Sequence, residues 1–274
     1  MQQRTLAFIG AGNMSRSIIA GLIQAGYPAE RIIAANPSRP KLDELASQFG
    51  IRITQDNAEA AREAEVIVLA VKPQLMAGML TALVAELGSL DGKLLISIAA
   101  GIRVARLQEM AGGHDRIIRT LPNTPSLLGL GMTGLYAPPA IGQADRAVAE
   151  QMMQSVGKTL WVDEEAGING VIAAAGSAPA YFFLFMQAIA EEAEAMGFTP
   201  EQARLLVQQT ALGAAAMVEQ NPELSLQTLR EQVTSKGGTT AEAVKTFQEQ
   251  GLMSLTARAM QAAVTRAGEM ETLF

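Results

Sequence analysis

The chain has 274 residues, a formal net charge of −6, one histidine and no cysteine. These counts exclude disulfides, thiolate nucleophiles and thiolate metal ligands, and they leave too few Cys and His residues for a four-ligand structural zinc site. A catalytic triad with a histidine base would have to use His114, which stands in a polar Ala-Gly-Gly-His-Asp turn. The acidic charge argues against a nucleic-acid partner. If the protein is an enzyme, we expect its chemistry to come from a bound cofactor.

The kind of acidic residue changes along the chain. Residues 1–163 carry 15 Lys and Arg against 14 Asp and Glu, whereas residues 164–274 carry 6 against 13. All six Asp lie in the first part, and the second part uses Glu alone. Because Asp favours caps and turns while Glu favours helix interiors, this shift predicts a mixed α/β domain over 1–163 and a helical domain over 164–274.

Strand-like and helix-like segments alternate through the first part. Short apolar runs predict strands over residues 5–9, 31–36, 51–54, 66–71, 93–99, 116–120, 131–136 and 159–162. Segments with helical periodicity lie between them, over residues 13–25, 41–49, 58–64, 76–87, 104–110 and 145–156. This alternation predicts a doubly wound parallel sheet of the Rossmann-like class.

Strand signals stop after residue 162, and the rest of the chain is predicted to be helical. We expect helices over residues 180–196, 200–219, 226–232, 240–249 and 252–270. Helix breakers separate them, namely Gly197, Asn221-Pro222 and Gly251.

One stretch is long and apolar enough to span a membrane, because residues 166–190 contain no charged side chain. It is interrupted by glycines and Pro179, however, and two Glu flank each end where a membrane span would favour Lys or Arg. We therefore expect a loop that leads into a buried helix. Helices apolar on most faces are often shared with a partner subunit. The chain start lacks the apolar run of a signal peptide, so we expect a cytoplasmic protein.

The strongest local motif follows the first predicted strand and opens a helix, which is the context of a dinucleotide-binding loop. Gly10 permits a tight turn, and Gly12 lets a pyrophosphate approach the backbone N–H groups at the helix N-terminus. Ser15 replaces the third glycine and is small enough for close helix–strand contact. An ordinary glycine turn is the alternative interpretation.

The end of the second predicted strand indicates which cofactor is bound. NAD sites usually place Asp or Glu there to accept the ribose 2′-hydroxyl, whereas this chain has Asn36. Ser38 and Arg39 follow, and both can hydrogen-bond a 2′-phosphate. A solvated arginine in a loop is the alternative. We expect NADP(H) to be preferred, with NAD(H) as the second cofactor.

A second anion site is predicted in the helical part, where residues 233–240 precede a helix. Gly237 and Gly238 followed by Thr239 and Thr240 can form a backbone nest that binds a carboxylate through N–H groups. The alternative interpretation is a capped entry from a loop into a helix.

Five segments in this order resemble pyrroline-5-carboxylate reductase, and the resemblance extends over essentially the whole chain. The segments are residues 8–14, 70–74, 119–125, 173–181 and 233–240. The resemblance implies NAD(P)H-dependent reduction of Δ1-pyrroline-5-carboxylate to L-proline, the last step of proline biosynthesis. It also implies a Rossmann-like domain and a C-terminal α-helical domain that forms a homodimer, with further assembly into a higher homo-oligomer. Nucleic acid and membrane are not implied as partners.

Carried over by position, the resemblance also implies the site residues, and it implies no metal. Near the cofactor it places Gly10, Ala11, Gly12, Asn13, Met14, Asn36, Ser38, Arg39, Asn57, Ala70, Val71, Lys72, Pro73, Pro122 and Asn123. Around the substrate it places Ser235, Gly237, Gly238, Thr239 and Thr240. Thr240 matches the threonine proposed to hydrogen-bond the ring nitrogen, which makes it the catalytic candidate.

Three positions depart from the family pattern. Ala175 and Ala178 stand where serine and glycine are usual, and Lys236 replaces a proline. We expect these changes to alter KM and not to abolish activity. Two other functions remain as alternatives. One is a β-hydroxyacid-type dehydrogenase, which would need a helical lysine in a setting that Lys236 and Lys245 lack. The other is a non-catalytic NADP-binding dimer.

Overall fold

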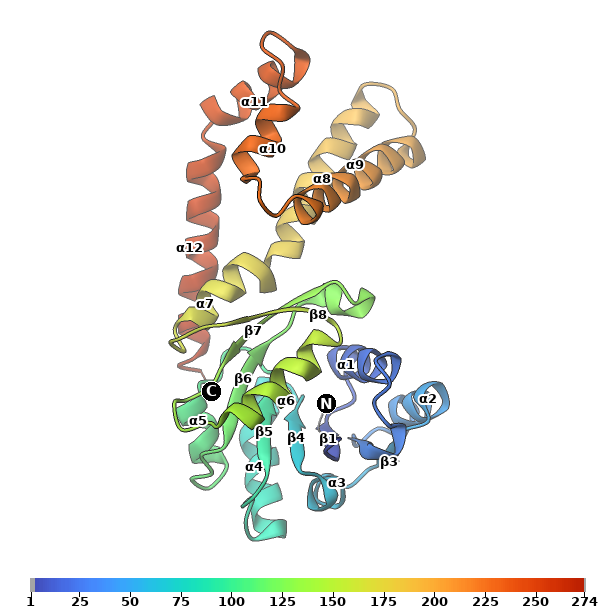
Figure 1. The fold of residues 1–274 in the computed structure, drawn as a ribbon, viewed down its shortest axis with the longest axis vertical. Helices are drawn as coiled ribbons and strands as arrows, with labels where there is room; N and C mark the ends of the chain where they lie inside the picture. Colours follow the sequence, from blue (N-terminus) through green and yellow to red (C-terminus); the bar gives the residue numbers. More distant parts are fainter. Residues whose placement is uncertain (1–2, 274) are drawn as a thin grey trace. The chain divides into compact units, whose positions relative to one another are not determined.

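A computed structural model describes residues 3–273 of the chain. The chain forms two compact units, which are described separately (Figure 1). Unit 1 runs to Ser177 and includes the chain again from Ala263, and unit 2 is Ala178–Ala262. Residues 164–177 therefore group with the sheet of unit 1. The expected domain boundary between residues 163 and 164 stays a prediction.

Unit 1 is built on an eight-stranded sheet with the order β3-β2-β1-β4-β5-β6-β7-β8. All neighbouring strands are parallel except β6 and β7, so the Rossmann-like prediction is confirmed with one local departure. The link between β6 and β7 is too short for a helical crossover, so the chain turns back antiparallel. The strands are β1 Leu6–Ile9, β2 Ile32–Ala35, β3 Arg52–Thr54, β4 Val66–Leu69, β5 Leu94–Ser97, β6 Ile117–Leu121, β7 Gly131–Tyr136 and β8 Gly157–Trp161.

Helices cover both faces of this sheet, which explains why its central strands are continuous apolar runs. One core cluster packs Phe8 of β1 against α1, α2 and α6, and the other packs Ile9 against α3, α4 and α5 (Figure 1). The helices of unit 1 are α1 Asn13–Gln24, η1 Ala29–Arg31, α2 Arg39–Phe49, α3 Asn57–Glu63, α4 Pro73–Leu87, α5 Val104–Met110, η2 Thr124–Leu128, α6 Gln143–Gln154, α7 Gly167–Val171 and the π-turn η3 Ile172–Gly176.

Unit 2 is helical, as predicted. Its helices are α8 Ala178–Ala195, α9 Pro200–Gln220, α10 Leu226–Gln232, α11 Thr239–Glu249 and α12 Leu252–Met270, the last of which continues into unit 1. Helices α8 and α9 pack against each other. The start of α9 is fixed by a capping box, in which Thr199 and Gln202 bond each other's backbone N–H and Pro200 is the first residue.

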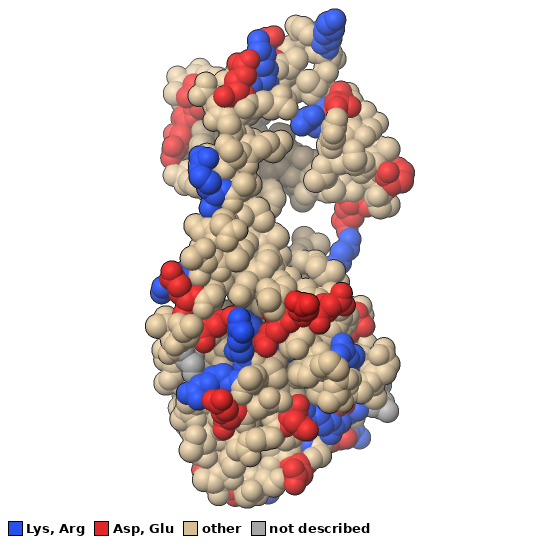
Figure 2. Space-filling model, turned by 90° about the vertical axis from the view of Figure 1, so that its left-hand side faces the viewer, with Lys and Arg blue, Asp and Glu red and all other residues tan. Residues whose placement is uncertain are grey.

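The expectation of a loop leading into a buried helix was wrong for residues 166–190. The chain is helical from Gly167, and α8 exposes Phe182, Phe183 and Leu184 by 65 to 68%. An apolar composition indicates a surface that is buried away from water. Other residues of the same chain do not bury this surface of α8. In Figure 2, broad uncharged areas lie between scattered charges over the helices of unit 2.

By length and composition, the helical segment Gly167–Ala195 could cross a membrane, with a mean hydropathy of 1.5. One such segment does not distinguish a membrane span from a helix covered by another protein surface.

Candidate functional site

The turn after β1 has room for no side chain at its first residue. Gly10 has a φ of 110°, and a Cβ there would lie 2.6 Å from the carbonyl oxygen of Ala70, at the end of β4. Its N–H donates to the carbonyl of Ala35 at 2.8 Å, at the end of β2. Gly10 is therefore enclosed by the ends of both strands that flank β1, and a glycine is required there.

Two residues later, the same turn is open. Gly12 is the N-cap of α1 in an extended conformation, and a Cβ there would meet no atom within 4 Å. No side chain caps this helix end, so the first N–H groups of α1 are available to an anion. Asn13 and Met14 form the first turn of the helix. This geometry fits the pyrophosphate of a dinucleotide.

Ser15 adds a bond that the sequence did not predict. Its buried hydroxyl donates to the carbonyl of Gly10 at 2.6 Å, so it holds the tight turn closed from inside the helix. Sequence reasoning had required only a small side chain at this position.

Asn36 joins the ends of β1 and β2. Its Oδ1 accepts a bond from the N–H of Ala11 at 3.3 Å, and its Nδ2 donates to the carbonyl of Ser38 at 3.1 Å. Ser38 is the N-cap of α2 without a side-chain cap bond, and Arg39 is the first residue of that helix. A second helix N-terminus is thus held next to the glycine turn.

Arg39 already has a partner. Its Nε donates to Asp43 one turn along α2 at 2.8 Å, and 59% of the Arg39 side chain is exposed. Exposed ion pairs contribute little, about 1 kcal/mol or less, so a phosphate can replace Asp43 as the partner of Arg39.

The other predicted cofactor residues follow β3 and β4 at the same edge of the sheet. The N–H of Ala70 donates to the carbonyl of Ile9 at 2.9 Å, and Lys72 and Pro73 are the N-cap and first residue of α4. Val71 packs partly against the core. Asn57 opens α3 after β3.

Pro122 and Asn123 follow β6, and Asn123 has a structural task. Its buried amide donates to the carbonyl of Ala175 in η3 at 3.0 Å and accepts from the N–H of Met132 in β7 at 2.9 Å. The next turn, η2, packs against α1. Asn123 therefore clamps the π-turn to the sheet, a role that sequence reasoning missed because its two partners lie far along the chain.

The second predicted anion site is a local feature of unit 2. Gly237 has a φ of 75°, and the N–H of Gly238 donates to the carbonyl of Ser235 at 2.9 Å. Gly238 is the N-cap of α11 without a side-chain cap, and Thr239 and Thr240 form the first turn. All of these residues except the half-buried Gly238 are exposed in the chain. The geometry is that of a nest with free backbone N–H groups.

The three departures from the family pattern cause no backbone strain. No described residue other than glycine has a positive φ, so neither Ala178 nor Lys236 is forced into a glycine conformation. Ala178 is buried as the first residue of α8, and Lys236 is exposed. At Ala175 the carbonyl is used by Asn123.

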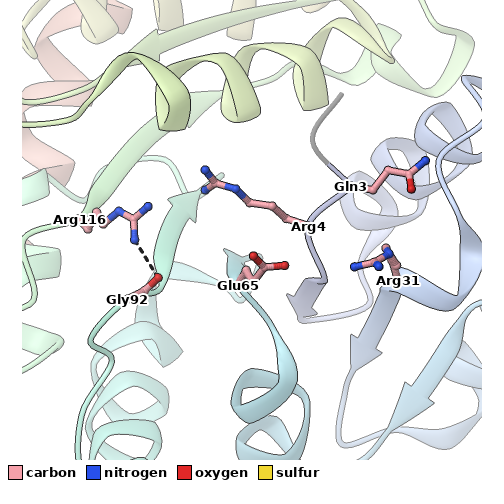
Figure 3. A pocket seen from close by; sticks show the side chains of 6 residues that line it. All are labelled: Gln3, Arg4, Arg31, Glu65, Gly92 and Arg116. Atoms are coloured by element: carbon pink, nitrogen blue, oxygen red, sulfur yellow. Dashed lines mark hydrogen bonds between the residues drawn. The ribbon is translucent and has the colours of Figure 1, made fainter.

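A hollow of about 510 Å³ lies at the opposite, amino edge of the sheet (Figure 3). Its lining residues come just before strands: Gln3 and Arg4 precede β1, Arg31 precedes β2, Glu65 precedes β4, and Gly92 and Arg116 precede β5 and β6. Ligands of open α/β sheets bind at the carboxyl ends instead.

Two of these arginines stabilise the fold. Arg4 and Arg116 both bond the buried Asp145, at 2.8 and 2.6 Å. Burial raises the pKa of Asp145, but the bonds from Arg116 and Arg4 outweigh it and leave that pKa below its usual value. The hollow is therefore not the candidate site.

Groups that could hold a metal are absent from the described part of the chain, since residues 3–273 contain no set of three or more His, Asp or Glu suited to an ion. His114 lies before β6 at the amino edge, with Nε2 3.0 Å from the carbonyl oxygen of Lys93.

Comparisons with known proteins identify the family of the chain. A family model described as pyrroline-5-carboxylate reductase dimerisation matches residues 165–270, and one described as NADP oxidoreductase, coenzyme F420-dependent, matches residues 5–101. The pyrroline-5-carboxylate reductase of Vibrio alginolyticus is 58% identical over 100% of both chains. The chain belongs to the pyrroline-5-carboxylate reductase family. The relative in Haemophilus influenzae is 46% identical, again over 100% of both chains.

Solved structures of the same family match the whole chain. The pyrroline-5-carboxylate reductase of Coxiella burnetii is 41% identical with a TM-score of 0.93, covering 98% of this chain and 99% of its own. That of Plasmodium falciparum, solved with NADP bound, is 27% identical with a TM-score of 0.85, covering 99% of each. The two-part architecture is thus that of the family.

The glycine turn generates a matched pair of variants. Gly10→Ser should lower the free energy of unfolding by more than about 1 kcal/mol, because φ is positive and the Ala70 carbonyl blocks a Cβ. Gly12→Ser should change it by less than about 1 kcal/mol, since serine is a good N-cap in the extended conformation. Gly12→Ser should nevertheless weaken NADPH binding, because its side chain occupies the open space. Denaturant unfolding measures the free energy of unfolding of each variant, and fluorescence titration measures its affinity for NADPH. Equal stability losses in the two variants would contradict this description of the turn.

Proposed function

We propose that this protein catalyses the NADPH-dependent reduction of Δ1-pyrroline-5-carboxylate to L-proline, the last step of proline biosynthesis. The observation that carries the proposal is 58% identity to a pyrroline-5-carboxylate reductase over the full length of both chains. The uncapped N-termini of α1 and α2 in unit 1 and the nest of unit 2 supply anion sites for a dinucleotide and for a carboxylate. The β-hydroxyacid-type dehydrogenase and the non-catalytic dimer gain no support from the comparisons.

In this proposal the residues of unit 1 bind and orient the cofactor. The N–H groups at the start of α1, beside the open Gly12, hold the pyrophosphate. Ser38 and Arg39 at the start of α2 bind the 2′-phosphate, which favours NADP(H) over NAD(H). Asn57, residues 70–73, Pro122 and Asn123 contribute from the neighbouring strand ends. The bound cofactor supplies a hydride from its nicotinamide to the C=N carbon of the substrate.

The residues of the nest hold the substrate. Backbone N–H groups between Ser235 and Thr240, other than that of Gly238, bind its carboxylate without a dedicated arginine. The hydroxyl of Thr240 supports the proton at the ring nitrogen, which makes the imine a stronger electrophile. Hydride transfer requires that the two reacting carbons are aligned and that this nitrogen carries a positive charge. A histidine or a thiolate is not needed.

We further propose that the C-terminal helices form a homodimer and that dimers assemble into a higher homo-oligomer in the cytoplasm. The match to the dimerisation model over residues 165–270 supports the homodimer. The exposed Phe182, Phe183 and Leu184 of α8 supply apolar surface for such an interface. Neither nucleic acid nor a membrane is a partner in this proposal.

A comparison of substrates tests the activity. Purified protein should oxidise NADPH when Δ1-pyrroline-5-carboxylate is added, and it should not reduce NADP⁺ with 2-hydroxy acids. Proline measured by chromatography should equal the NADPH consumed. Turnover of a 2-hydroxy acid alone would favour the dehydrogenase alternative, and no turnover with tight NADPH binding would favour the non-catalytic one.

Arg39→Ala should lower kcat/KM for NADPH while kcat/KM for NADH stays nearly constant. The loss corresponds to one charge-assisted hydrogen bond, about 1.5–3 kcal/mol, or roughly 10- to 150-fold. Arg266→Ala is the control, because the Arg266 side chain is similarly exposed and pairs with Glu269 one turn along its own helix. A loss below about threefold would remove Arg39 from the 2′-phosphate site.

Thr240→Ala should lower kcat by about 100-fold, the lower end of the range for a group that assists proton transfer. Thr240→Ser should restore much of the activity, because it keeps the hydroxyl. Thr246→Ala, in the same helix with its hydroxyl bonded to the carbonyl of Glu242, serves as the control. An unchanged kcat in steady-state assays of Thr240→Ala would exclude a role for this hydroxyl.

A further inference from the structure

A buried guanidinium lies in β6, apart from the proposed cofactor and substrate residues. Arg119 has no exposed surface, and its Nη1 donates to Oε1 of Glu165 and to Oε1 of Glu271, both at 3.0 Å. Its Nε and Nη2 are buried without a hydrogen-bond partner in the described part of the chain. The position of Arg119 therefore depends on these two carboxylates.

Two further contacts complete what we call the Arg119 cluster, which consists of Arg103, Arg119, Glu165 and Glu271. Arg103 donates from Nε to Oε2 of Glu271 at 2.7 Å, and the Glu271 side chain is only 4% exposed. Oε1 of Glu165 also accepts the N–H of Val104 at the start of α5, at 2.7 Å. The cluster thus contains two guanidinium groups and two carboxylates, and its formal charges sum to zero.

The titration of Glu271 agrees with this balance. Burial raises the pKa of Glu271, but bonds from Arg103 and Arg119 outweigh burial and hold that pKa below its usual value. The carboxylate is therefore charged at neutral pH, as its two arginine partners require.

The cluster joins the two segments through which the chain leaves and re-enters unit 1. The outgoing connector, residues 165–177, begins at Glu165, and the returning connector, residues 263–271, ends at Glu271. One guanidinium nitrogen holds both. The outgoing connector is also clamped by Asn123 at Ala175, and the returning one packs on Gly101, where a Cβ would lie 3.1 Å from that of Met270.

The composition of the cluster favours a positional role over a purely stabilising one. A buried ion cluster is often no more stabilising than apolar side chains of similar volume, and here two guanidinium donors remain unpaired. Apolar side chains could fill this place, since a small core cluster that includes Leu121 and Ile168 lies in the same region of unit 1. Ion pairs, in contrast to apolar contacts, fix the direction and the register of the two segments that they join.

We propose that the Arg119 cluster is a positioning device for hydride transfer, which holds both connectors of the unit that carries the substrate nest. This inference rests on the proposed function. Hydride transfer requires two carbons to be aligned, and a displacement of about 1 Å caused by a distant residue can lower the rate by on the order of 100-fold. None of its members is among the proposed substrate or cofactor residues, and we assign them as positioning residues.

Glu271→Gln tests the proposal, and Glu269→Gln is its matched control. The control makes the same chemical change two residues away, in an exposed pair with Arg266 at 2.7 Å. In Glu271→Gln, kcat should fall by on the order of 10- to 100-fold. The Kd for NADPH should change less than about twofold. The deuterium isotope effect on kcat with NADPH labelled at the transferred position should rise, because poorly aligned transfer becomes rate-limiting. The control should match wild type.

Arg103→Met provides a second variant should Glu271→Gln fold poorly, because the Arg103 side chain is 55% exposed and bonds Oε2 of Glu271. It should change kcat and the isotope effect in the same direction by a smaller factor. Hydrogen–deuterium exchange should quicken in residues 167–177 and 263–270 of both variants, and stay constant in β1 and β4.

Three results would overturn the proposal. They are a lower melting temperature with wild-type kcat and isotope effect, an equal loss in Glu269→Gln, or unchanged exchange in both connectors. If the wild-type protein does not reduce pyrroline-5-carboxylate, the proposed function fails instead, and the exchange measurement still decides whether the cluster holds the connectors.

Discussion

The cofactor half of the molecule depends on one steric constraint, the absence of room for a Cβ at Gly10. The turn after β1 passes so close to the end of β4 that a methyl group would overlap the carbonyl of Ala70. Because the turn is this tight, the N-terminus of α1 lies at the carboxyl ends of the strands. Ser15 and Asn36 then fix the turn from two sides by hydrogen bonds to its backbone.

Both proposed anion sites use the backbone more than basic side chains. The N-caps of α1 and α11 are glycines, Gly12 and Gly238, and neither helix end is capped by a side chain. Free N–H groups and the helix dipole supply the attraction at each. A chain with a net charge of −6 can therefore bind a dinucleotide and a carboxylate without a basic surface.

Local pattern predicted much of this molecule. Continuous apolar runs indicated the buried strands, breakers such as Gly197 and Gly251 separated the helices of unit 2, and the glycine turn was identified with the helix that it opens. The antiparallel turn at β7 and the π-turn were not predicted, because short links and single-residue insertions leave no periodic signal.

Long-range polar contacts were equally hidden from the sequence. Asn123 bonds a carbonyl 52 residues away, and Arg119 bonds carboxylates 46 and 152 residues away. The family resemblance implied a cofactor contact for Asn123, and no role was assigned to Arg119. The exposure of α8 was not predicted either. An apolar composition indicates that a surface is buried, but it does not indicate whether the same chain or another protein buries it.

The anchoring of Glu271 has a practical consequence for handling the protein. Chain ends usually tolerate extension because little holds them. Here a buried carboxylate lies three residues from the last residue, and it belongs to the interior of unit 1. An affinity tag or fusion partner attached close to residue 271 would therefore act on a packed segment of unit 1.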